Sequence, residues 1–455
     1  MKKSNDSLAK NTILLSIGTF MTKGLSFIMV PIFSRWLSTE DYGTFDLLCT
    51  YVTLLIPLIG LASNEALFRF SMDEKSEDGK RKYISNCLAI FTINFLLFVL
   101  IATILRIAFK WNLAFYFCVL LAGELYNLHL RGYLRAIKHL DVYSFVNAIS
   151  TMCIAVITTF LLKFVEMGLE GIILGYGLGY LLGDLIIVVW TKYWRYLAFH
   201  EISIAGMKQL ISYSYALIPN SLAWWLINVS DRTIINVFLG AAANGIYAIA
   251  YKIPNILSSV FGVFSVSWQQ SATEALSSAD RDKYYNEIYN KMSVILLSLC
   301  CGILSLNSWL FNYIFDIKYY DGHLYAPILI GGTVFATLSQ FYGGIQISFK
   351  QPKENGITTI VGAVANLIIH FGLIKFVGLY AAAVSTILSQ ILVCVLRNYR
   401  LKKIVDLKFT KKTLIYFAIY CYFTVLAYYI TNQFVNVLNV VLATILVLWV
   451  NKEAL

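Results

Sequence analysis

WLSTEDYGTFDLLCTY, residues 36–51, aligns without a gap with FLGAAANGIYAIAYKI, residues 238–253. The offset is 202 residues, and it places Leu37 on Leu239, Gly43 on Gly245 and Phe45 on Tyr247. In each stretch the glycine predicts a tight turn between two long apolar segments. The chain is therefore expected to contain two copies of one structural unit.

The prolines support this repeat. Pro31 and Pro57 lie on either side of the first turn, and Pro219 and Pro254 lie on either side of the second. Proline usually kinks a helix, because it removes a backbone hydrogen bond and clashes with the preceding turn. Bent helices are therefore predicted at corresponding places in both units.

Composition sets the class of protein. Of the 455 residues 59% are hydrophobic and only 13% are charged, and the mean hydropathy is +0.70. An average soluble domain has about 25% charged residues, and a membrane helix needs about 20 mostly apolar residues. We predict an all-α polytopic membrane protein with about 14 transmembrane helices, at 11–37, 43–70, 84–108, 112–134, 142–163, 170–190, 212–239, 244–269, 291–315, 325–349, 356–374, 378–397, 412–431 and 433–450.

The repeat divides these helices into two six-helix lobes and an additional pair. The expected boundaries are 1–190 for the N-terminal lobe, 191–211 for a cytoplasmic linker, 212–400 for the C-terminal lobe and 401–455 for helices 13 and 14. Repeats with an even number of helices are parallel, so the lobes should be related by a pseudo-two-fold axis along the membrane normal. This architecture suits alternating access around a central cavity, although duplication alone would also give repeated helix pairs.

The basic residues indicate the orientation in the membrane. If the N-terminus is cytoplasmic, the inner segments hold 26 of the 36 lysines and arginines, as the positive-inside rule requires. An even number of helices then places both termini in the cytoplasm. The same distribution explains the net charge of +11 without a nucleic-acid partner. The polar inner loop at 270–291 is a candidate amphipathic helix at the membrane surface.

Of the four basic residues assigned to the interior of membrane helices, Arg69 ends its helix at the inner surface, where snorkelling is expected. The other three lie deeper, namely Lys23, Arg232 and Lys252. Lys23 is about 12 residues, or about 18 Å, from either end of its helix, too far for its side chain to reach water along the lipid face. Ionisable groups at such depth face protein or a wet cavity. We expect all three to line a basic, substrate-binding cavity in which Asp231 offsets part of the charge. The alternatives are a structural ion pair for Lys23 and snorkelling to the outer surface for the other two.

Polar and aromatic residues accompany these charges. Asn228 and Trp225 lie in the same segment as Arg232, and an amide and an aromatic face beside a cation suit sugar rings and phosphates. Ordinary packing is the alternative for the aromatic residues. Glu124 and Asp184 lie deep in other helices. They are candidates for ion coupling, with pairing to a base as the alternative.

Enzyme signatures are missing. The sequence has no GxxxxGK[ST] loop, no HExxH and no GxSxG, and its eight cysteines form no CxxC pair or Cys/His cluster. We therefore expect no cofactor, no metal site and no enzymatic activity.

Two segments carry a family resemblance: KGLSFIMVPIFSRWLSTEDYG at 23–43 and DRTIINVFLGAAANGIYAIAYKIPNIL at 231–257. They resemble the Wzx-type O-antigen and polysaccharide flippases, the polysaccharide transporter family of the multidrug/oligosaccharidyl-lipid/polysaccharide (MOP) exporter superfamily. The additional pair at 412–450 is similar to that of the fourteen-helix lipid II flippases. The resemblance implies a V of two six-helix lobes around a cationic cavity, with Lys23, Arg232 and Lys252 where such proteins place basic cavity residues.

The resemblance also implies a function. The substrate would be undecaprenyl-diphosphate-linked oligosaccharide, moved from the inner to the outer leaflet of the bacterial inner membrane. H+ or Na+ would be the coupling ion, and a polysaccharide polymerase would be a candidate partner. The alternatives are a multidrug/cation antiporter of the same superfamily, which should favour an acidic cavity, and a membrane polysaccharide polymerase or ligase, which should need a large outer loop. A non-transporting assembly scaffold is the third alternative.

Overall fold

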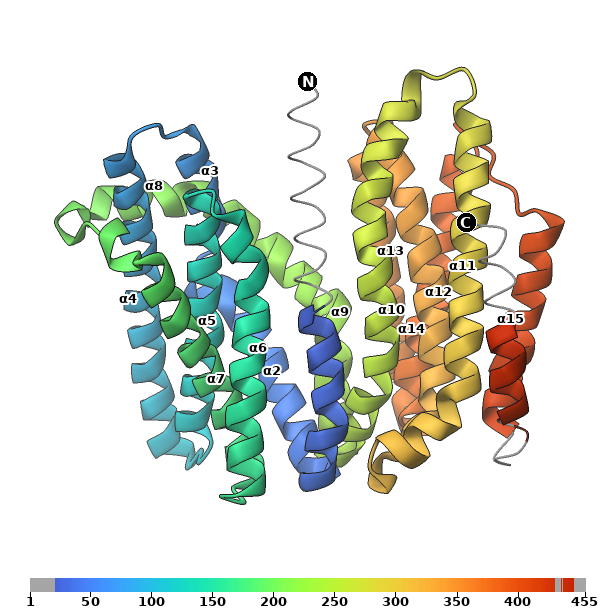
Figure 1. Ribbon diagram of the computed structural model, residues 1–455, viewed down its shortest axis with the longest axis horizontal. Helices are drawn as coiled ribbons and strands as arrows, with labels where there is room; N and C mark the ends of the chain where they lie inside the picture. Colours follow the sequence, from blue (N-terminus) through green and yellow to red (C-terminus); the bar gives the residue numbers. More distant parts are fainter. Residues whose placement is uncertain (1–20, 430–434, 436, 446–455) are drawn as a thin grey trace. The chain divides into compact units, whose positions relative to one another are not determined.

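The fold is entirely helical in the part of the chain that the computed structural model describes, which is residues 21–429, 435 and 437–445. No strand occurs among these residues. By their contacts the helices form two compact units, unit 1 (Met1–Arg232) and unit 2 (Thr233–Leu455) (Figure 1). The chain is thus an all-α polytopic membrane protein, as its composition predicts.

Unit 1 begins with a helix over residues 21–36. The elements that follow are α2 (Thr39–Ile59), α3 (Ser63–Asp73), α4 (Glu77–Phe109), α5 (Ala114–Ala136), α6 (Leu140–Lys163), α7 (Gly168–Thr191), η1 (Tyr193–Tyr196), η2 (Phe199–Glu201), α8 (Ile204–Ser214), η3 (Tyr215–Leu217) and α9 (Ile218–Leu239), whose last residues belong to unit 2. The elements of unit 2 that follow are α10 (Ala241–Glu274), η4 (Ala275–Ser277), α11 (Arg281–Trp309), η5 (Leu310–Ile314), η6 (Ile317–Tyr319), α12 (Gly322–Ser348), α13 (Pro352–Val377), α14 (Tyr380–Leu401) and α15 (Lys411–Tyr429).

Nine helices of the described part are long and apolar enough to cross a membrane. Helices α5, α9 and α15 are of comparable length, with 23, 22 and 19 residues. Residues 11–20 of the first predicted helix, residues 430 and 431 of the thirteenth, and residues 433, 434, 436 and 446–450 of the last one lie outside the described residues. The described helices otherwise follow the predicted order of spans.

The repeat appears in the helix starts. Helix α2 begins at Thr39 and α10 at Ala241, which are 202 residues apart. The two glycines were predicted to form the turns, and this is wrong. Gly43 and Gly245 are buried inside the beginnings of α2 and α10, one turn beyond the connection.

Other residues make these connections. Ser38 caps α2, since its hydroxyl oxygen accepts a hydrogen bond from the backbone N–H of Asp41 at 3.0 Å. Before α10 the backbone turns at Gly240, whose φ of +87° is readily adopted only by glycine. The same helix pairing also recurs in each unit: α7 packs on α5 and α6, and α14 packs on α12 and α13.

The predicted helix at 43–70 is not continuous. Helix α2 ends at Ile59, two residues after Pro57, and α3 begins at Ser63. Between them Leu61 and Ala62 have φ values of +49° and +50°. That left-handed conformation costs an ordinary residue about 1–2 kcal/mol, so the surrounding structure must hold it in place. Helix periodicity cannot reveal such a break, because the apolar pattern continues through it.

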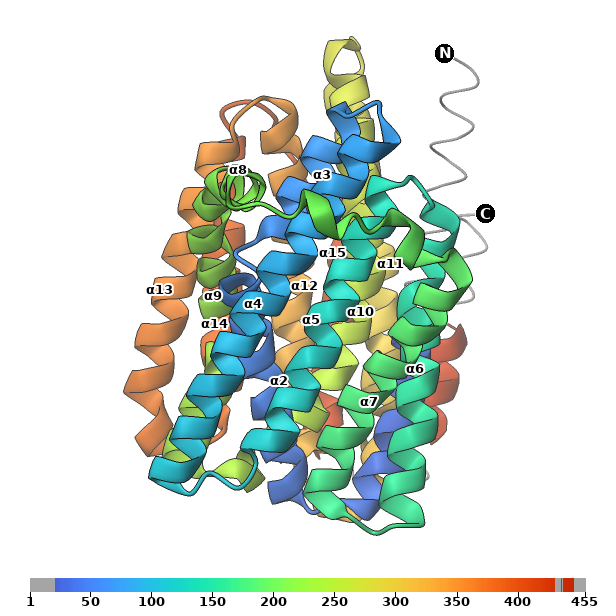
Figure 2. The same ribbon diagram turned by 90° about the vertical axis from the view of Figure 1, so that its left-hand side faces the viewer.

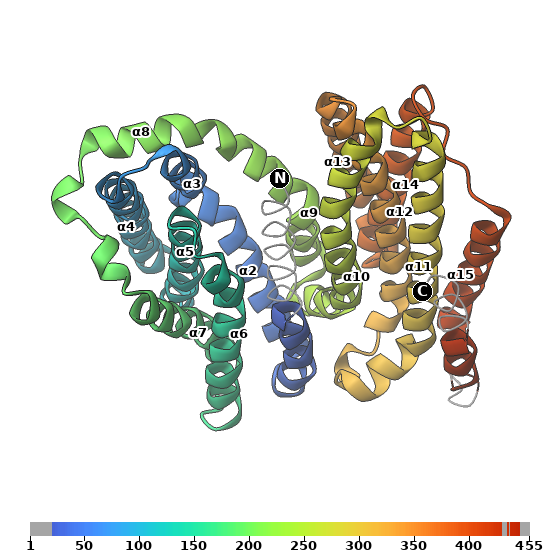
Figure 3. The same cartoon turned by 45° about the horizontal axis from the view of Figure 1, so that its top comes forward.

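Two inner segments also differ from a simple loop. The 270–291 segment is not a separate surface helix: it continues α10 to Glu274, turns at η4 and starts α11 at Arg281. Residues 191–211 contain η1, η2 and the start of α8. Helix α8 lies across the ends of the long helices of unit 1 and packs on α3 and α4 (Figures 2 and 3).

A seam of small residues joins α6 and α7, as the four-residue spacing of glycines on α7 indicates. A Cβ atom at Gly175 would lie 2.3 Å from Thr158 Oγ1, and one at Gly179 would lie 2.5 Å from Ile154 Cα. The contact partners on α6 are also four residues apart. The two backbones therefore approach closely along several turns.

Replacing Gly179 with alanine should lower the thermal unfolding temperature of the detergent-purified protein. The added methyl group meets backbone atoms of α6, and overpacking of this kind typically costs about 1–3 kcal/mol. Gly262→Ala in α10 is the matched control, because nothing lies within 4 Å of its Cβ position. Equal unfolding temperatures for the two variants would show that α6 shifts to accommodate the added methyl group without a loss of stability.

Candidate functional site

Arg232 pairs with an acid that the sequence did not assign to it. Arg232 Nε lies 2.8 Å from Asp46 Oδ2, which joins the end of α9 in unit 1 to α2. Only 11% of the Arg232 side chain and 14% of the Asp46 side chain are exposed. Removing one partner of a pair this secluded leaves the other charge uncompensated. The ion pair with Asp46 therefore helps to fix where the Arg232 guanidinium lies.

Trp225 makes a second contact between the same helices. Its indole Nε1 donates a hydrogen bond to the backbone carbonyl of Thr50 at 2.9 Å. Thr50 is one turn after Asp46 on α2, and Arg232 is two turns after Trp225 on α9. Two predicted cavity residues thus fix α9 along α2.

The other predicted cavity residues are more scattered. Asp231 is buried, next to Arg232. Lys23 lies in the 21–36 helix with an exposed side chain, and Lys252 lies half-buried on α10 in unit 2. The side chain of Asn228 falls outside the described residues. The structure thus groups Trp225, Asp231 and Arg232 on α9.

The two predicted coupling acids belong to a polar cluster inside unit 1. Glu124 lies on α5 and Asp184 on α7. Their helices are in close contact, because a Cβ atom at Gly123 would lie 2.6 Å from the carbonyl oxygen of Gly177. Both acids are close enough to Arg131 for an electrostatic interaction. The structure therefore places both acids near the Arg131 side chain.

Asn127 connects this cluster to α6. Its Nδ2 donates hydrogen bonds to Asp184 Oδ1 at 2.8 Å and to Ser150 Oγ at 3.0 Å. Asp184 Oδ2 and Asn127 Oδ1 are buried and have no hydrogen-bond partner among the described residues. A buried, unsatisfied acceptor is costly. The carboxylate oxygen of Asp184 can take a proton, and both oxygens can be ligands to a small cation.

Arg131 is a member of this cluster that the sequence interpretation missed. It lies within the predicted helix 112–134, but it was counted among the basic residues of the cytoplasmic end of that helix and not as an intramembrane charge; α5 continues to Ala136. Glu124, Asn127 and Arg131 are spaced by three and four residues, so they share one face of the helix. This spacing was already present in the predicted helix 112–134 and is the signal that could have revealed Arg131.

The sequence profile of a family described as "Polysaccharide biosynthesis protein" matches residues 8–269, more than half of the chain. The chain belongs to this family. The matched region contains the whole of unit 1 from residue 8 onward and extends into α10 of unit 2. It therefore includes the Asp46–Arg232 pair and the Glu124 cluster, which is the group formed by Glu124, Asn127, Arg131 and Asp184. No curated protein sequence matches the chain.

Solved structures of the MOP superfamily share this fold. The lipid II flippase MurJ in its inward closed conformation is 16% identical, with a TM-score of 0.68 and coverage of 97% of this chain and 98% of MurJ. A multidrug resistance MATE family transporter in an inward-facing conformation is 13% identical, with a TM-score of 0.65 over 86% of this chain and 98% of its own. A mutant of the Vibrio cholerae MATE transporter VcmN is 11% identical, with a TM-score of 0.57 and coverage of 90% of this chain and 100% of the VcmN chain. The fold is therefore that of flippases and transporters of this superfamily.

Proposed function

We propose that this protein is a flippase that moves undecaprenyl-diphosphate-linked oligosaccharide from the inner to the outer leaflet of the bacterial cytoplasmic membrane. The observation that carries the proposal is the family match over residues 8–269 on a fold shared with a lipid II flippase. The helices would alternate between inward-open and outward-open states. The distribution of lysine and arginine supports cytoplasmic termini.

The basic side chains supply the recognition in this proposal. A diphosphate carries about two negative charges, and its attraction to a cation at 4 Å is about four times stronger at an effective dielectric constant near 20 than in water. Lys23 and Arg232 of unit 1 bind the diphosphate, and Trp225 contacts sugar. Asp46 orients Arg232 through the 2.8 Å ion pair, so that the guanidinium enters the site already positioned.

The Glu124 cluster couples transport to an ion gradient in the same proposal. Asp184 Oδ2 takes H+, or it binds Na+ together with Asn127 Oδ1; both oxygens are buried and without a hydrogen-bond partner in the described part of the chain. Arg131 interacts with both acids and keeps the unloaded site from carrying two uncompensated charges.

The second candidate is a multidrug/cation antiporter. The observation that favours it is the pair of intramembrane acids, Glu124 and Asp184, on a fold shared with MATE transporters. A cationic drug would then bind where we place the coupling ion. Efflux of a cationic dye from cells that express the protein, lost in Asp184→Asn, would favour this candidate over the flippase.

Lys23→Ala should abolish or strongly reduce surface polysaccharide in cells whose own gene has been deleted. A charge-assisted hydrogen bond contributes about 1.5–3 kcal/mol, so substrate affinity should fall by about tenfold to hundredfold. Membrane abundance should stay constant, because the Lys23 side chain is exposed. Lys110→Ala, an exposed lysine at the end of α4, is the matched control. Normal polysaccharide in the Lys23 variant would remove this residue from the site.

A further inference from the structure

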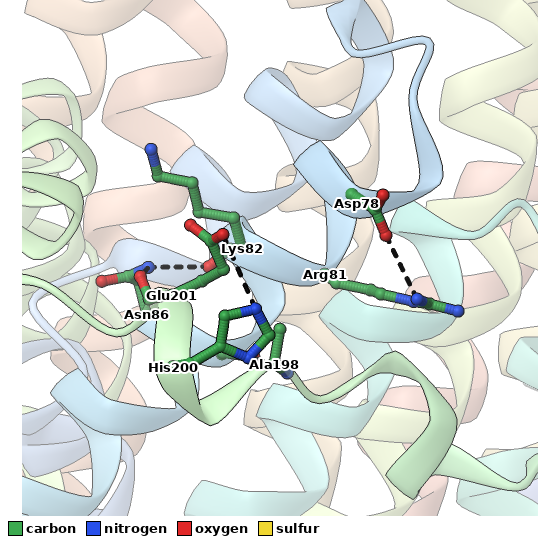
Figure 4. A network of polar contacts seen from close by, with 8 residues as sticks. Asp78, Arg81, Lys82, Asn86, Ala198, His200 and Glu201 are labelled. Atoms are coloured by element: carbon green, nitrogen blue, oxygen red, sulfur yellow. Dashed lines mark hydrogen bonds and ion pairs between the residues drawn. The ribbon is translucent and has the colours of Figure 1, made fainter.

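The segment just before α8 is held to α4 by a small polar network, of which Figure 4 shows the hydrogen bond between Asn86 and Glu201. Asn86 Nδ2 donates a hydrogen bond to the carbonyl oxygen of Glu201 at 3.0 Å, and Asn86 Oδ1 accepts one from the backbone N–H of Ser203 at 3.0 Å. Ser203 then caps α8, since its hydroxyl oxygen accepts from the N–H of Gly206 at 3.1 Å. A Cβ atom at Gly206 would lie 2.7 Å from Asn86 Oδ1. The start of α8 is therefore held close to α4.

Beyond this attachment the two helices enclose a groove of about 510 Å³. Its lining is mostly apolar and consists of Leu61, Ile90, Ile93, Asn94, Ile204, Met207, Lys208, Ile211 and Ser212. Ile204 is 82% exposed and Ile93 is 47% exposed. All of these residues belong to unit 1, and none of them is assigned to substrate recognition or ion coupling above. The groove thus offers an apolar surface that a membrane lipid can cover.

Lys208 is the only charged residue in this lining. Its side chain is exposed and, within the described part of the chain, has no acidic partner within 4 Å. A lysine near a membrane surface attracts acidic lipid headgroups. The charge and the apolar lining together match a molecule with a phosphate at one end and a hydrocarbon chain at the other.

The length of the exposed face on α4 fits one lipid leaflet. Half of the hydrocarbon core is about 15 Å thick, which corresponds to about ten residues of helix. A chain that enters at Ile90 would therefore pass as far as Leu100. Leu96, Leu97 and Leu100 on this stretch of α4 are all more than half exposed. A hydrocarbon chain leaving the groove would continue along these leucines.

We propose that the groove between α4 and α8 binds one acidic phospholipid, with its phosphate at Lys208 and an acyl chain on Ile93, Ile204 and Ile211. The bound lipid also contacts the break between α2 and α3, since Leu61 lines the groove and its carbonyl oxygen accepts a hydrogen bond from Ser214 Oγ at 2.7 Å. Lipid occupancy would thus stabilise the left-handed backbone at Leu61. This site is independent of the proposed flippase function.

The test is retention of phosphatidylglycerol against phosphatidylcholine by the purified full-length protein, measured by native mass spectrometry at equal lipid concentrations. We expect one phosphatidylglycerol to be retained preferentially. Lys208→Gln should reduce its retention about fivefold, the ratio that corresponds to about 1 kcal/mol per lysine near a membrane surface. Ile93→Trp should also reduce it, because the indole fills the groove while Lys208 stays.

Lys75→Gln is the matched control, since this exposed lysine precedes α4 and lies outside the groove. The Lys75→Gln variant should retain as much phosphatidylglycerol as the unchanged protein. Equal retention of the two phospholipids, or equal retention by all variants, would overturn the proposal. Displacement of phosphatidylglycerol by undecaprenyl phosphate at the same concentration would also overturn it, because the groove would then belong to the carrier of the substrate.

Discussion

Asp46→Ala is expected to lower the free energy of unfolding by about 3–5 kcal/mol, the usual cost of removing one partner from a buried ion pair. Only 11% of the Arg232 side chain is exposed in the unchanged protein, and in the variant its guanidinium would lose the acid at 2.8 Å. The measurement is the thermal unfolding temperature of the protein in detergent, followed by tryptophan fluorescence. Glu40→Ala, an exposed acid at the start of the same helix, should leave that temperature almost unchanged.

Exchanging the two charges separates the structural role of Arg232 from its proposed role in binding. The double variant Asp46→Arg with Arg232→Asp keeps an ion pair between α2 and α9. We expect it to recover most of the unfolding temperature that either single variant loses, without recovering transport, since the cation then sits on the other helix. Recovery of transport together with stability would mean that the pair is only structural.

Asp184→Asn is expected to uncouple transport from the ion gradient. The amide keeps an oxygen that accepts the 2.8 Å hydrogen bond from Asn127, but it cannot bind a proton and holds a cation poorly. Moving one elementary charge through 100 mV is worth about 2.3 kcal/mol. The loss of one coupled charge should therefore lower the accumulation ratio of substrate by about 50-fold. The ratio is measured in proteoliposomes with and without an imposed gradient.

Glu166→Gln is the control for this variant, because Glu166 is an exposed acid just before α7. It should retain the full response to the gradient. Glu124→Gln should resemble Asp184→Asn, since both acids interact with Arg131. A normal gradient response in both cluster variants would place the coupling ion elsewhere in the protein.

The sequence predicted the class and the repeat well, because both depend on averages over many residues. Apolar runs of about 20 residues mark membrane helices whatever their neighbours are. The repeated segments 36–51 and 238–253 predicted the corresponding starts of α2 and α10. The break at Leu61 was not predictable in this way. It depends on hydrogen bonds from Asn94 and Ser214, residues far away in sequence.

The site was predicted only in part, because charged residues are easy to find in an apolar helix and their partners are not. Glu124, Asp184 and Arg232 stood out as charges at membrane depth. That Asp46 pairs with Arg232 depends on how α2 and α9 pack, and the two residues are separated by 186 positions. Arg131 lies in the predicted helix 112–134, but it was counted with the basic residues of the cytoplasmic end, so its proximity to Glu124 and Asp184 was missed.

The central claim is tested most directly by translocation in proteoliposomes that contain only this protein. The substrate is a fluorescent undecaprenyl-diphosphate-linked oligosaccharide, compared with the same oligosaccharide on uncharged polyprenol. We predict gradient-driven translocation of the diphosphate form, at least tenfold faster than that of the uncharged form. The reason is that the uncharged lipid loses at least one charge-assisted contact of about 1.5–3 kcal/mol. Equal rates for the two lipids, or no translocation of either lipid alongside export of a cationic dye, would contradict the account.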